Sequence, residues 1–249
     1  MTNISKTQFG FTLIELLVAT FIFTSLLAVA YNLMNSTLLS KKELELSLNV
    51  NEQVKNANEI LQGVLRQADG DFFTDGEFGI SSFGGQTAHL FLLSDNYVSP
   101  NSNGVLPVHW DSIYKGNNLY VKTKEGNEKK IYIFQLKKNQ GQEGGTMYIE
   151  SWVYNQNAVS NHYWKQDQSL TELLNFGTNL ESYFSIPIKV DNNGNKLPLS
   201  VYNPSLGELP PMDIYLKLRV TAVNNWQNKK YQRQLNQIYV PLVISNPYL

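Results

Sequence analysis

The first quarter of the chain carries two hydrophobic patterns in succession. From Phe11 to Met34 the side chains are almost all apolar, and Glu15 is the single charged residue of that run. An α-helix rises about 1.5 Å per residue, so a run of this length can cross a hydrocarbon core ~30 Å thick. The pattern therefore predicts either a membrane-spanning helix or a signal segment.

Beyond Met34 the pattern becomes amphipathic. Apolar residues recur at steps of three and four, at Val50, Val54, Ala57, Leu61, Val64, Leu65 and Ala68. That spacing is typical of a helix with one packing face. Residues 43–48 alternate with period two, which locally favours a strand, but neither Gly nor Pro occurs over residues 11–62. We therefore predict one continuous helix from Phe11 to about Leu65, with a stop at residues 68–71.

From Phe72 onward, short runs rich in Val, Ile, Tyr and Phe are separated by clusters of Gly, Asn, Asp and Pro. This arrangement is typical of an antiparallel β domain. The predicted strands cover residues 88–93, 119–123, 130–136, 146–154, 185–190, 214–222 and 237–244. Residues 124–127 and 191–195 are predicted turns, and residues 169–176 a short helix. The fold class is therefore α+β, with a long N-terminal helix packed on a C-terminal antiparallel β-sheet domain.

Composition narrows the function classes. The 249 residues include 20 Lys and Arg against 21 Asp and Glu, which gives a formal charge of -1 at pH 7. Such a chain lacks the basic field that neutralises many phosphates, so nucleic acid is not the expected partner. The absence of cysteine excludes a disulfide framework, thiolate metal sites and thiol catalysis.

Two interpretations of the apolar N-terminal segment compete. In the first it is an ordinary secretory signal, with Lys6 as a thin basic region and a small-residue cleavage site ending at Ala30. The mature chain would then be a secreted binding protein. This interpretation gives Glu15 no role, and no Gly or Pro stops the helix at Ala30.

The second interpretation rests on the residues Gly10-Phe11-Thr12-Leu13-Ile14-Glu15, which follow a short polar leader and open the apolar run. This segment resembles the class III leader of type IV pilins and type II secretion pseudopilins. The resemblance implies that prepilin peptidase cuts between Gly10 and Phe11 and that the new N-terminus at Phe11 is methylated. It also implies that the apolar helix is retained in the mature protein.

The same resemblance implies a location and a set of partners. The subunit would be inserted as a single-pass protein in inner membrane lipid, with a periplasmic C-terminal domain, and then incorporated into a filament with other pilin or pseudopilin subunits. The implied division is a leader over residues 1–10, a helix over residues 11–68 with its membrane span at about 11–34, and a globular β-rich domain over residues 69–249. The family implies no cofactor.

Glu15 also stands out on physical grounds. An ionisable side chain inside an apolar span costs ~2.5–3.5 kcal/mol on insertion scales, so it usually has a partner. Cleavage before Phe11 creates an amine four residues from Glu15, about one helical turn away. In the family this pairing helps to bring a new subunit into register. The alternative is that Glu15 simply lies at the boundary between membrane and water.

The C-terminal part gives a looser indication of the subtype. Residues 209–211, followed by the runs 214–220 and 231–243, resemble the ending of the larger minor pilins and J-type minor pseudopilins, which are thought to sit at or near filament tips. The chain is also larger than most major pilins. We therefore expect a minor pilin of a type IV pilus, with a minor pseudopilin of a type II secretion system as the alternative.

Enzymatic and metal sites have little support in the sequence. His89, His109 and His162 lie far apart, and neither a nucleophile elbow nor a phosphate-binding loop occurs. We therefore expect no enzyme. Weak calcium candidates crowd one loop, namely Asp69, Asp71, Asp75 and Glu77, although their spacing does not fit an EF-hand. Asp191, Asn193 and Asn195 also alternate, but this pattern is typical of a turn.

A lysine-rich hairpin and an aromatic stretch are the residues that could contact nucleic acid. Six lysines fall on one predicted hairpin, namely Lys122, Lys124, Lys129, Lys130, Lys137 and Lys138. Trp152, Tyr154, Tyr163 and Trp164 form an aromatic stretch that could stack on bases. With a net charge of -1 the signal is not strong, and lysines that protect a solvated strand edge are the preferred interpretation.

Overall fold

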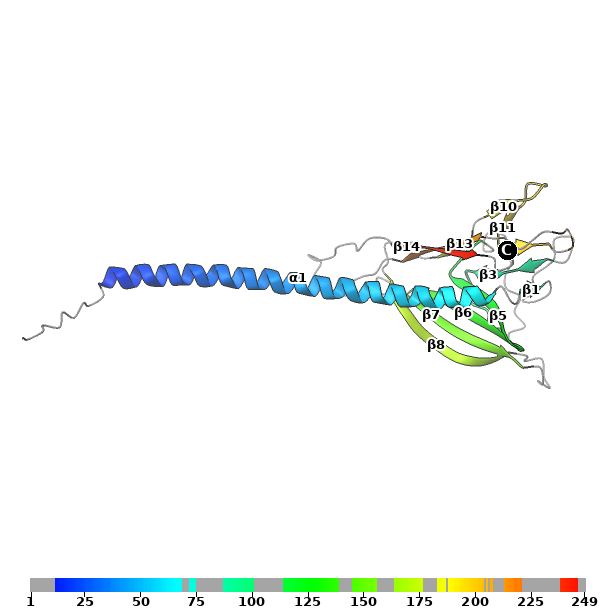
Figure 1. Ribbon diagram of the computed structural model, residues 1–249, viewed down its shortest axis with the longest axis horizontal. Coiled ribbons are helices and arrows are strands. Elements are labelled where there is room, and N and C mark those ends of the chain that lie inside the picture. Colours follow the sequence, from blue (N-terminus) through cyan, green and yellow to red (C-terminus); the bar gives the residue numbers. More distant parts are fainter. Residues whose placement is uncertain are drawn as a thin grey trace, which may run out of the picture. The chain divides into compact units, whose positions relative to one another are not determined.

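The structure is a computed structural model of the full chain (Figure 1). It describes residues 12–68, 72–74, 87–100, 114–138, 145–155, 164–176, 183–186, 188–203, 205, 207, 213–220 and 238–245. These residues belong to two compact units, Met1–Asn49 and Val50–Leu249.

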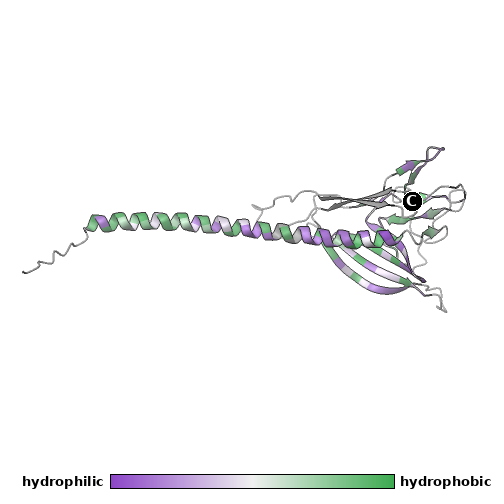
Figure 2. Ribbon diagram, viewed as in Figure 1, coloured by the Kyte–Doolittle hydropathy of each residue, from purple (hydrophilic) through white to green (hydrophobic). Residues whose placement is uncertain are grey.

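One helix, α1, runs continuously from Leu13 to Gln67 and therefore contributes to both units. The period-two stretch at residues 43–48 is helical, as the breaker-free sequence around it predicts. Gly63 is tolerated inside the last turns of the helix, which ends at Gln67. Figure 2 shows the change along α1 from a mostly apolar first part to a more polar second part.

The first unit consists, in its described residues, of the N-terminal part of α1. Its large apolar side chains are exposed, which is the opposite of what a helix in a soluble core shows. The second unit contains the C-terminal part of α1 and the β-sheets.

The main sheet of the second unit has five antiparallel strands in the order β3-β5-β6-β7-β8. The strands are β3 Phe91–Ser94, β5 Asn118–Glu125, β6 Glu128–Lys138, β7 Gly145–Tyr154 and β8 Trp164–Phe176. Leu119 pairs with Phe134, which in turn pairs with Ile149, so one row of apolar residues crosses the sheet. Glycine 126 has φ 62°, which suits the two-residue turn between β5 and β6.

Shorter antiparallel pairings complete the second unit. Strands β1 Phe73–Thr74, β2 Ala88–His89 and β12 Val201–Tyr202 form a sheet in the order β1-β2-β12. Three two-stranded pairings join β4 Lys115–Gly116 to β9 Phe184–Ser185, β10 Ile188–Val190 to β11 Lys196–Pro198, and β13 Asp213–Val220 to β14 Ile238–Ser245.

The core lies between α1 and one face of the main sheet. The helix contributes the predicted packing residues Val54, Ala57, Leu61, Val64, Leu65 and Ala68, all of them buried. They share one apolar cluster with sheet residues such as Leu119, Phe134 and Met147. A smaller cluster forms at alternate positions of β3, β5 and β6, with Leu92, Tyr120, Ile131 and Ile133, and also contains Phe73 of β1. The α+β class with a helix packed on an antiparallel sheet is thus confirmed.

Most predicted strands are confirmed, and one predicted helix is wrong. Residues 169–176 form the second half of β8, where Thr171 pairs with Ile149 and Leu174 with Met147. The local spacing of the leucines suits a helix, but pairing with β7 decides the conformation of the segment. Residues 88–93 and 185–190 are each divided between two strands, because β2 and β9 pair with partners different from those of β3 and β10.

Candidate functional site

The candidate functional site is the N-terminal part of α1, where apolar side chains are exposed along many turns. Leu13 is 83% exposed, and Phe21 and Ile14 are each 70% exposed. By length and composition, the span Leu13–Glu45 could cross a membrane. None of the most apolar part of this span is buried. A signal sequence has the same two properties, so the span by itself does not distinguish between the two interpretations.

Hydroxyl groups within this apolar segment are satisfied by the helix itself. Thr20 donates to the main-chain oxygen of Leu17 at 2.9 Å, and Ser25 to that of Phe21 at 2.8 Å. The same kind of bond is made by Thr24, Ser36 and Thr37. These polar groups therefore need no water and no partner helix, which suits a helix surrounded by lipid.

Glu15 forms a capping box with Thr12 at the start of α1. The main-chain N–H and the hydroxyl of Thr12 both donate to Glu15 Oε2 at 2.9 Å. In return the main-chain N–H of Glu15 donates to Thr12 Oγ1 at 3.4 Å. Thr12 is the N-cap, because its carbonyl accepts the first helical bond, from Leu16, at 3.2 Å. A carboxylate at this end of the helix is also favoured by the helix dipole.

Glu15 was a predicted site residue, but the capping role of Thr12 was not predicted. The signal was present, since Thr-x-x-Glu immediately before an apolar run is the pattern of a capping box. Gly10 and Phe11, the residues predicted to flank the cleaved bond, lie outside the described residues.

Residues 5–31 match the family model of the prokaryotic N-terminal methylation motif. Comparisons with curated proteins and with solved structures gave no match. The match includes Gly10, Phe11, Thr12 and Glu15 and ends within the apolar part of α1. It supports a pilin-like or pseudopilin-like subunit, that is, a structural protein with an N-terminal membrane anchor that is processed by prepilin peptidase and assembles with other subunits.

The weak calcium candidates Asp69, Asp71, Asp75 and Glu77 lie outside the described residues, as do His109 and His162. His89 is buried in β2 and pairs with Phe73 and Val201. Among the residues that the structure describes, no group of three or more His, Asp or Glu side chains is placed to hold a metal ion.

The 191–195 segment forms a turn, as predicted. The Asp191 carboxylate accepts hydrogen bonds from the main-chain N–H groups of Asn193 at 2.9 Å and Asn195 at 2.8 Å, and from the Asn195 side-chain amide at 2.9 Å. The bonds from Asn195 and then Asn193 lower the pKa of Asp191 below its ordinary value. The carboxylate therefore serves as the centre of an Asx-type turn between β10 and β11.

The lysine-rich hairpin is not an edge of the sheet over its whole length, so that interpretation is right only in part: β3 pairs with residues 118–121 of β5, and Lys122 and Lys124 lie beyond that pairing. Its strands β5 and β6 are interior strands of the five-stranded sheet. Lys122 is buried, with its Nζ 3.1 Å from the main-chain oxygen of Phe72. The interior position of the two strands could not be predicted, because the hairpin's outer partners, β3 and β7, cannot be deduced from the hairpin's own sequence.

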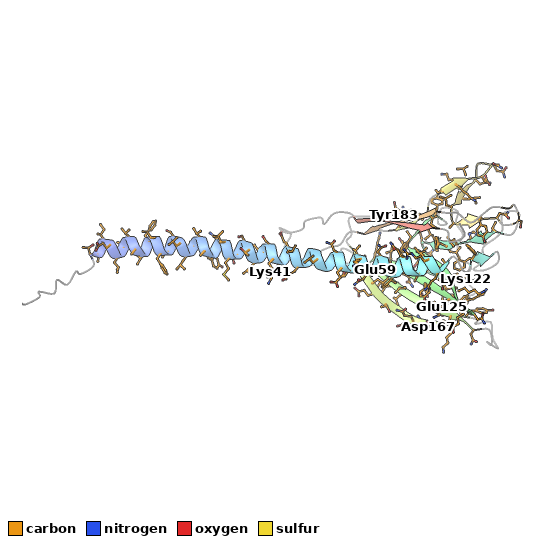
Figure 3. All side chains as sticks on the ribbon, in the orientation of Figure 1. Lys41, Glu59, Lys122, Glu125, Asp167 and Tyr183 are labelled. Carbon is orange, nitrogen blue, oxygen red and sulfur yellow. The ribbon has the colours of Figure 1, made fainter. Side chains whose placement is uncertain are left out.

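Lys130, on the same hairpin, lies among three carboxylates. Its Nζ is 3.7 Å from Glu125, 3.8 Å from Glu128 and 3.9 Å from Asp167. Figure 3 shows Glu125 and Asp167 near one end of the sheet. Burial alone would lower the pKa of the Lys130 ammonium, but nearby Tyr132 and the three carboxylates raise it above its ordinary value. Part of the lysine charge is therefore compensated within the domain.

The predicted aromatic stretch is only partly brought together. Tyr154 and Trp164 contact each other edge to face, with ring centroids 5.2 Å apart. Trp152 and Trp164 are half-buried against the smaller apolar cluster, and Tyr163 lies outside the described residues. The indoles therefore contribute to packing of the sheet face.

Sequence reasoning also missed a polar network on the sheet face that carries Tyr120. Glu150, buried on β7, accepts hydrogen bonds from the Gln135 amide at 3.0 Å and the Gln166 amide at 3.3 Å. Tyr120 accepts a hydrogen bond from the Val98 N–H at 2.8 Å, and burial raises the pKa of Tyr120 above its usual range. The Glu150 carboxylate therefore joins β6, β7 and β8 through side-chain hydrogen bonds.

Proposed function

We propose that this protein is a minor pilin-like structural subunit of a type IV filament system, with a place in the tip or initiation complex. The observation that carries the proposal is the coincidence of two features at the start of the chain. The methylation motif at residues 5–31 overlaps a helix whose apolar side chains are exposed, and the only charged residue of the apolar run is the capped Glu15.

The proposed maturation removes residues 1–10 and retains α1. Prepilin peptidase hydrolyses the bond between Gly10 and Phe11, and the new amine at Phe11 is methylated. Glycine at position 10 lets the backbone approach the peptidase closely, since it has no side chain. The mature chain is then anchored in the inner membrane by residues 11–34, with the β-rich domain in the periplasm.

The proposed work of the subunit is assembly by helix packing, without turnover of a substrate. In the membrane the exposed apolar face of α1 is covered by lipid, and in the filament it is covered by helices of neighbouring subunits. Glu15 provides the anion that a neighbouring N-terminal amine uses to find its register. The size of the chain and its C-terminal pattern support a minor subunit near the tip.

The mature N-terminus tests this proposal. Mass spectrometry of N-terminal peptides from the membrane fraction should find a chain that begins with methylated Phe11, and Gly10→Val should leave unprocessed precursor in the membrane. As a control, Ala30→Val should be processed as in the wild type. A mature chain that begins at Tyr31 would contradict the proposal and indicate a secreted protein with an ordinary signal.

Type II secretion pseudopilins begin with the same type of leader, and a minor pseudopilin is therefore the second candidate. The two are distinguished by the partners that are cross-linked to the protein in its native membrane. Recovery with pilus subunits supports the proposal, whereas recovery with the pseudopilins of a secretion system supports the second candidate.

A further inference from the structure

Thr12 differs from the other hydroxyl residues of the apolar segment. Thr20, Thr24, Ser25, Ser36 and Thr37 all donate to main-chain oxygens of their own helix. The hydroxyl of Thr12 instead donates to a side chain, the Glu15 carboxylate, at 2.9 Å. A hydroxyl that donates to the helix backbone satisfies only its own hydrogen-bonding capacity. A hydroxyl that donates to a carboxylate also restricts the position of the negative charge.

The two bonds from Thr12 reach the same oxygen of Glu15. Both the main-chain N–H and the hydroxyl donate to Oε2, and no hydrogen bond to Oε1 is present among the described residues. Two donors on one oxygen hold the carboxylate at the N-terminal end of the helix and select one side-chain rotamer. The second oxygen is left available to a donor from outside the residue pair.

We propose that Thr12 is a positioning residue for Glu15, an inference that rests on the assembly role proposed above. In the membrane, the two donors of Thr12 stabilise the Glu15 carboxylate within the same chain. It thereby holds Oε1 in the orientation in which a cationic amine of a neighbouring subunit can bind. Loss of the hydroxyl leaves one main-chain donor, so the carboxylate samples other rotamers and productive contact with the amine becomes rarer.

The test uses the full-length protein in its native host, with three single variants. Thr12→Val removes the hydroxyl but keeps the β-branched shape, Thr12→Ser keeps the hydroxyl, and Thr20→Val is the matched control for loss of a hydroxyl from the same helix. Each variant is measured for N-terminal cleavage, methylation, membrane insertion and recovery in sheared filaments or cross-linked tip complexes.

Thr12→Val should be cleaved, methylated and inserted as in the wild type, with recovery in assemblies lowered about fivefold, the factor that corresponds to a typical N-cap. Thr12→Ser and Thr20→Val should be recovered as in the wild type. In a Glu15→Gln background, Thr12→Val should add much less than its effect alone, because residues that act through one contact are not additive.

Three results would overturn the inference: wild-type recovery of Thr12→Val, recovery of Thr12→Ser as low as that of Thr12→Val, or a failure of Thr12→Val to be cleaved. The last would assign Thr12 to recognition by the peptidase. Glu15→Val separates this inference from the proposed function. If Glu15→Val is lost from assemblies while Thr12→Val is not, only the role of Thr12 fails. If Glu15→Val is recovered normally, the pairing role of Glu15 fails together with that of Thr12, whereas absence of the wild-type protein from filaments and tip complexes would contradict the proposed function itself.

Discussion

The ammonium group of Lys122 on β5 donates a hydrogen bond to the main-chain oxygen of Phe72, with 3.1 Å between Nζ and the oxygen. Lys122 is 2% exposed and also lies over the ring of Phe73, 5.9 Å from the centroid. Fifty residues of sequence separate the two partners. A buried charge thus ties the segment that leads into β1 to an interior strand of the main sheet.

We predict that Lys122→Met destabilises the β-rich domain by about 1–3 kcal/mol, because the Phe72 carbonyl loses its charged donor while the chain length of the side chain is kept. The matched control is Lys124→Met, an exposed lysine on the same strand, which should change stability by less than about 0.5 kcal/mol. Urea unfolding followed by circular dichroism measures both. Equal effects of the two variants would show that the contact with Phe72 contributes nothing.

Features that depend on local sequence could be predicted, and features that depend on distant residues could not. Helix α1 is specified locally, by a long run without Gly or Pro and by apolar spacing at Val54, Ala57 and Leu61, so its existence and its packing face were predictable. The Thr12–Glu15 box is also local and was readable from its spacing. The burial of Lys122 was not, since it depends on partners far away along the chain.

In β8 the local sequence favours a conformation that tertiary pairing overrides. Residues 169–176 contain Leu170, Leu173 and Leu174, whose spacing suits a helix face, yet tertiary pairing with β7 makes them a strand. The leucines do not share one buried face, because Leu174 is buried whereas Leu170 is 36% exposed. The register shifts in the β7–β8 pairing explain why strict alternation is absent there.

Two glycines should respond to alanine in opposite directions. A Cβ at Gly116 would lie 2.7 Å from the main-chain nitrogen and carbonyl carbon of Ser94, so Gly116→Ala should destabilise the domain by about 1–3 kcal/mol. A Cβ at Gly63 would meet nothing within 4 Å, and that residue lies inside α1. Gly63→Ala should therefore stabilise the protein by about 0.5–1 kcal/mol. Denaturant midpoints compare the two, and a gain of stability in Gly116→Ala would contradict the close approach of β4 to β3.

Asp191 should make a small part of the domain's stability dependent on pH. Its folded pKa is lowered by the hydrogen bonds from Asn195 and Asn193, so the folded state binds a proton less readily than the unfolded chain. The stabilisation is complete above the ordinary aspartate pKa, near 4, and is lost as the pH falls through the lowered pKa. We predict that Asp191→Asn destabilises the domain more at pH 7 than at pH 3. Asn192→Ala, on the same turn, should show no such difference between the two pH values.

Glu15→Val should impair incorporation while cleavage and membrane insertion remain intact. Valine removes the anion that a neighbouring amine would bind and makes the span more apolar, so insertion is not penalised. Recovery in sheared filaments or in a co-purified tip complex measures the effect. Thr20→Val, which keeps Glu15, is the control and should be recovered as in the wild type; wild-type recovery of Glu15→Val would show that the pairing is dispensable.

A fragment that begins near Lys41 should fold as a soluble, largely β domain. Among the α1 side chains whose burial is described, the buried ones begin at Val54, and those helix positions pack with the main sheet in one cluster, so the fragment keeps its core. It loses the exposed apolar residues Leu13 to Leu38, which account for most of the large exposed hydrophobic side chains among the described residues. Circular dichroism and gel filtration should therefore find a folded and soluble protein, and insolubility would show that the fragment boundary is wrong.

The same fragment tests whether the protein is a minor subunit. If the membrane span supplies the contacts between copies in a filament, the β-rich domain alone should not associate strongly with itself, because its apolar helix face is already covered by its own sheet. Contacts specific to a tip complex would instead involve the domain surface, so the fragment should bind other small pilin-like subunits in a pull-down. A fragment lengthened to begin at Met34 serves as the control for effects of the helix end. Tight homo-oligomers without binding to other subunits would favour a major-subunit role over a place at the tip.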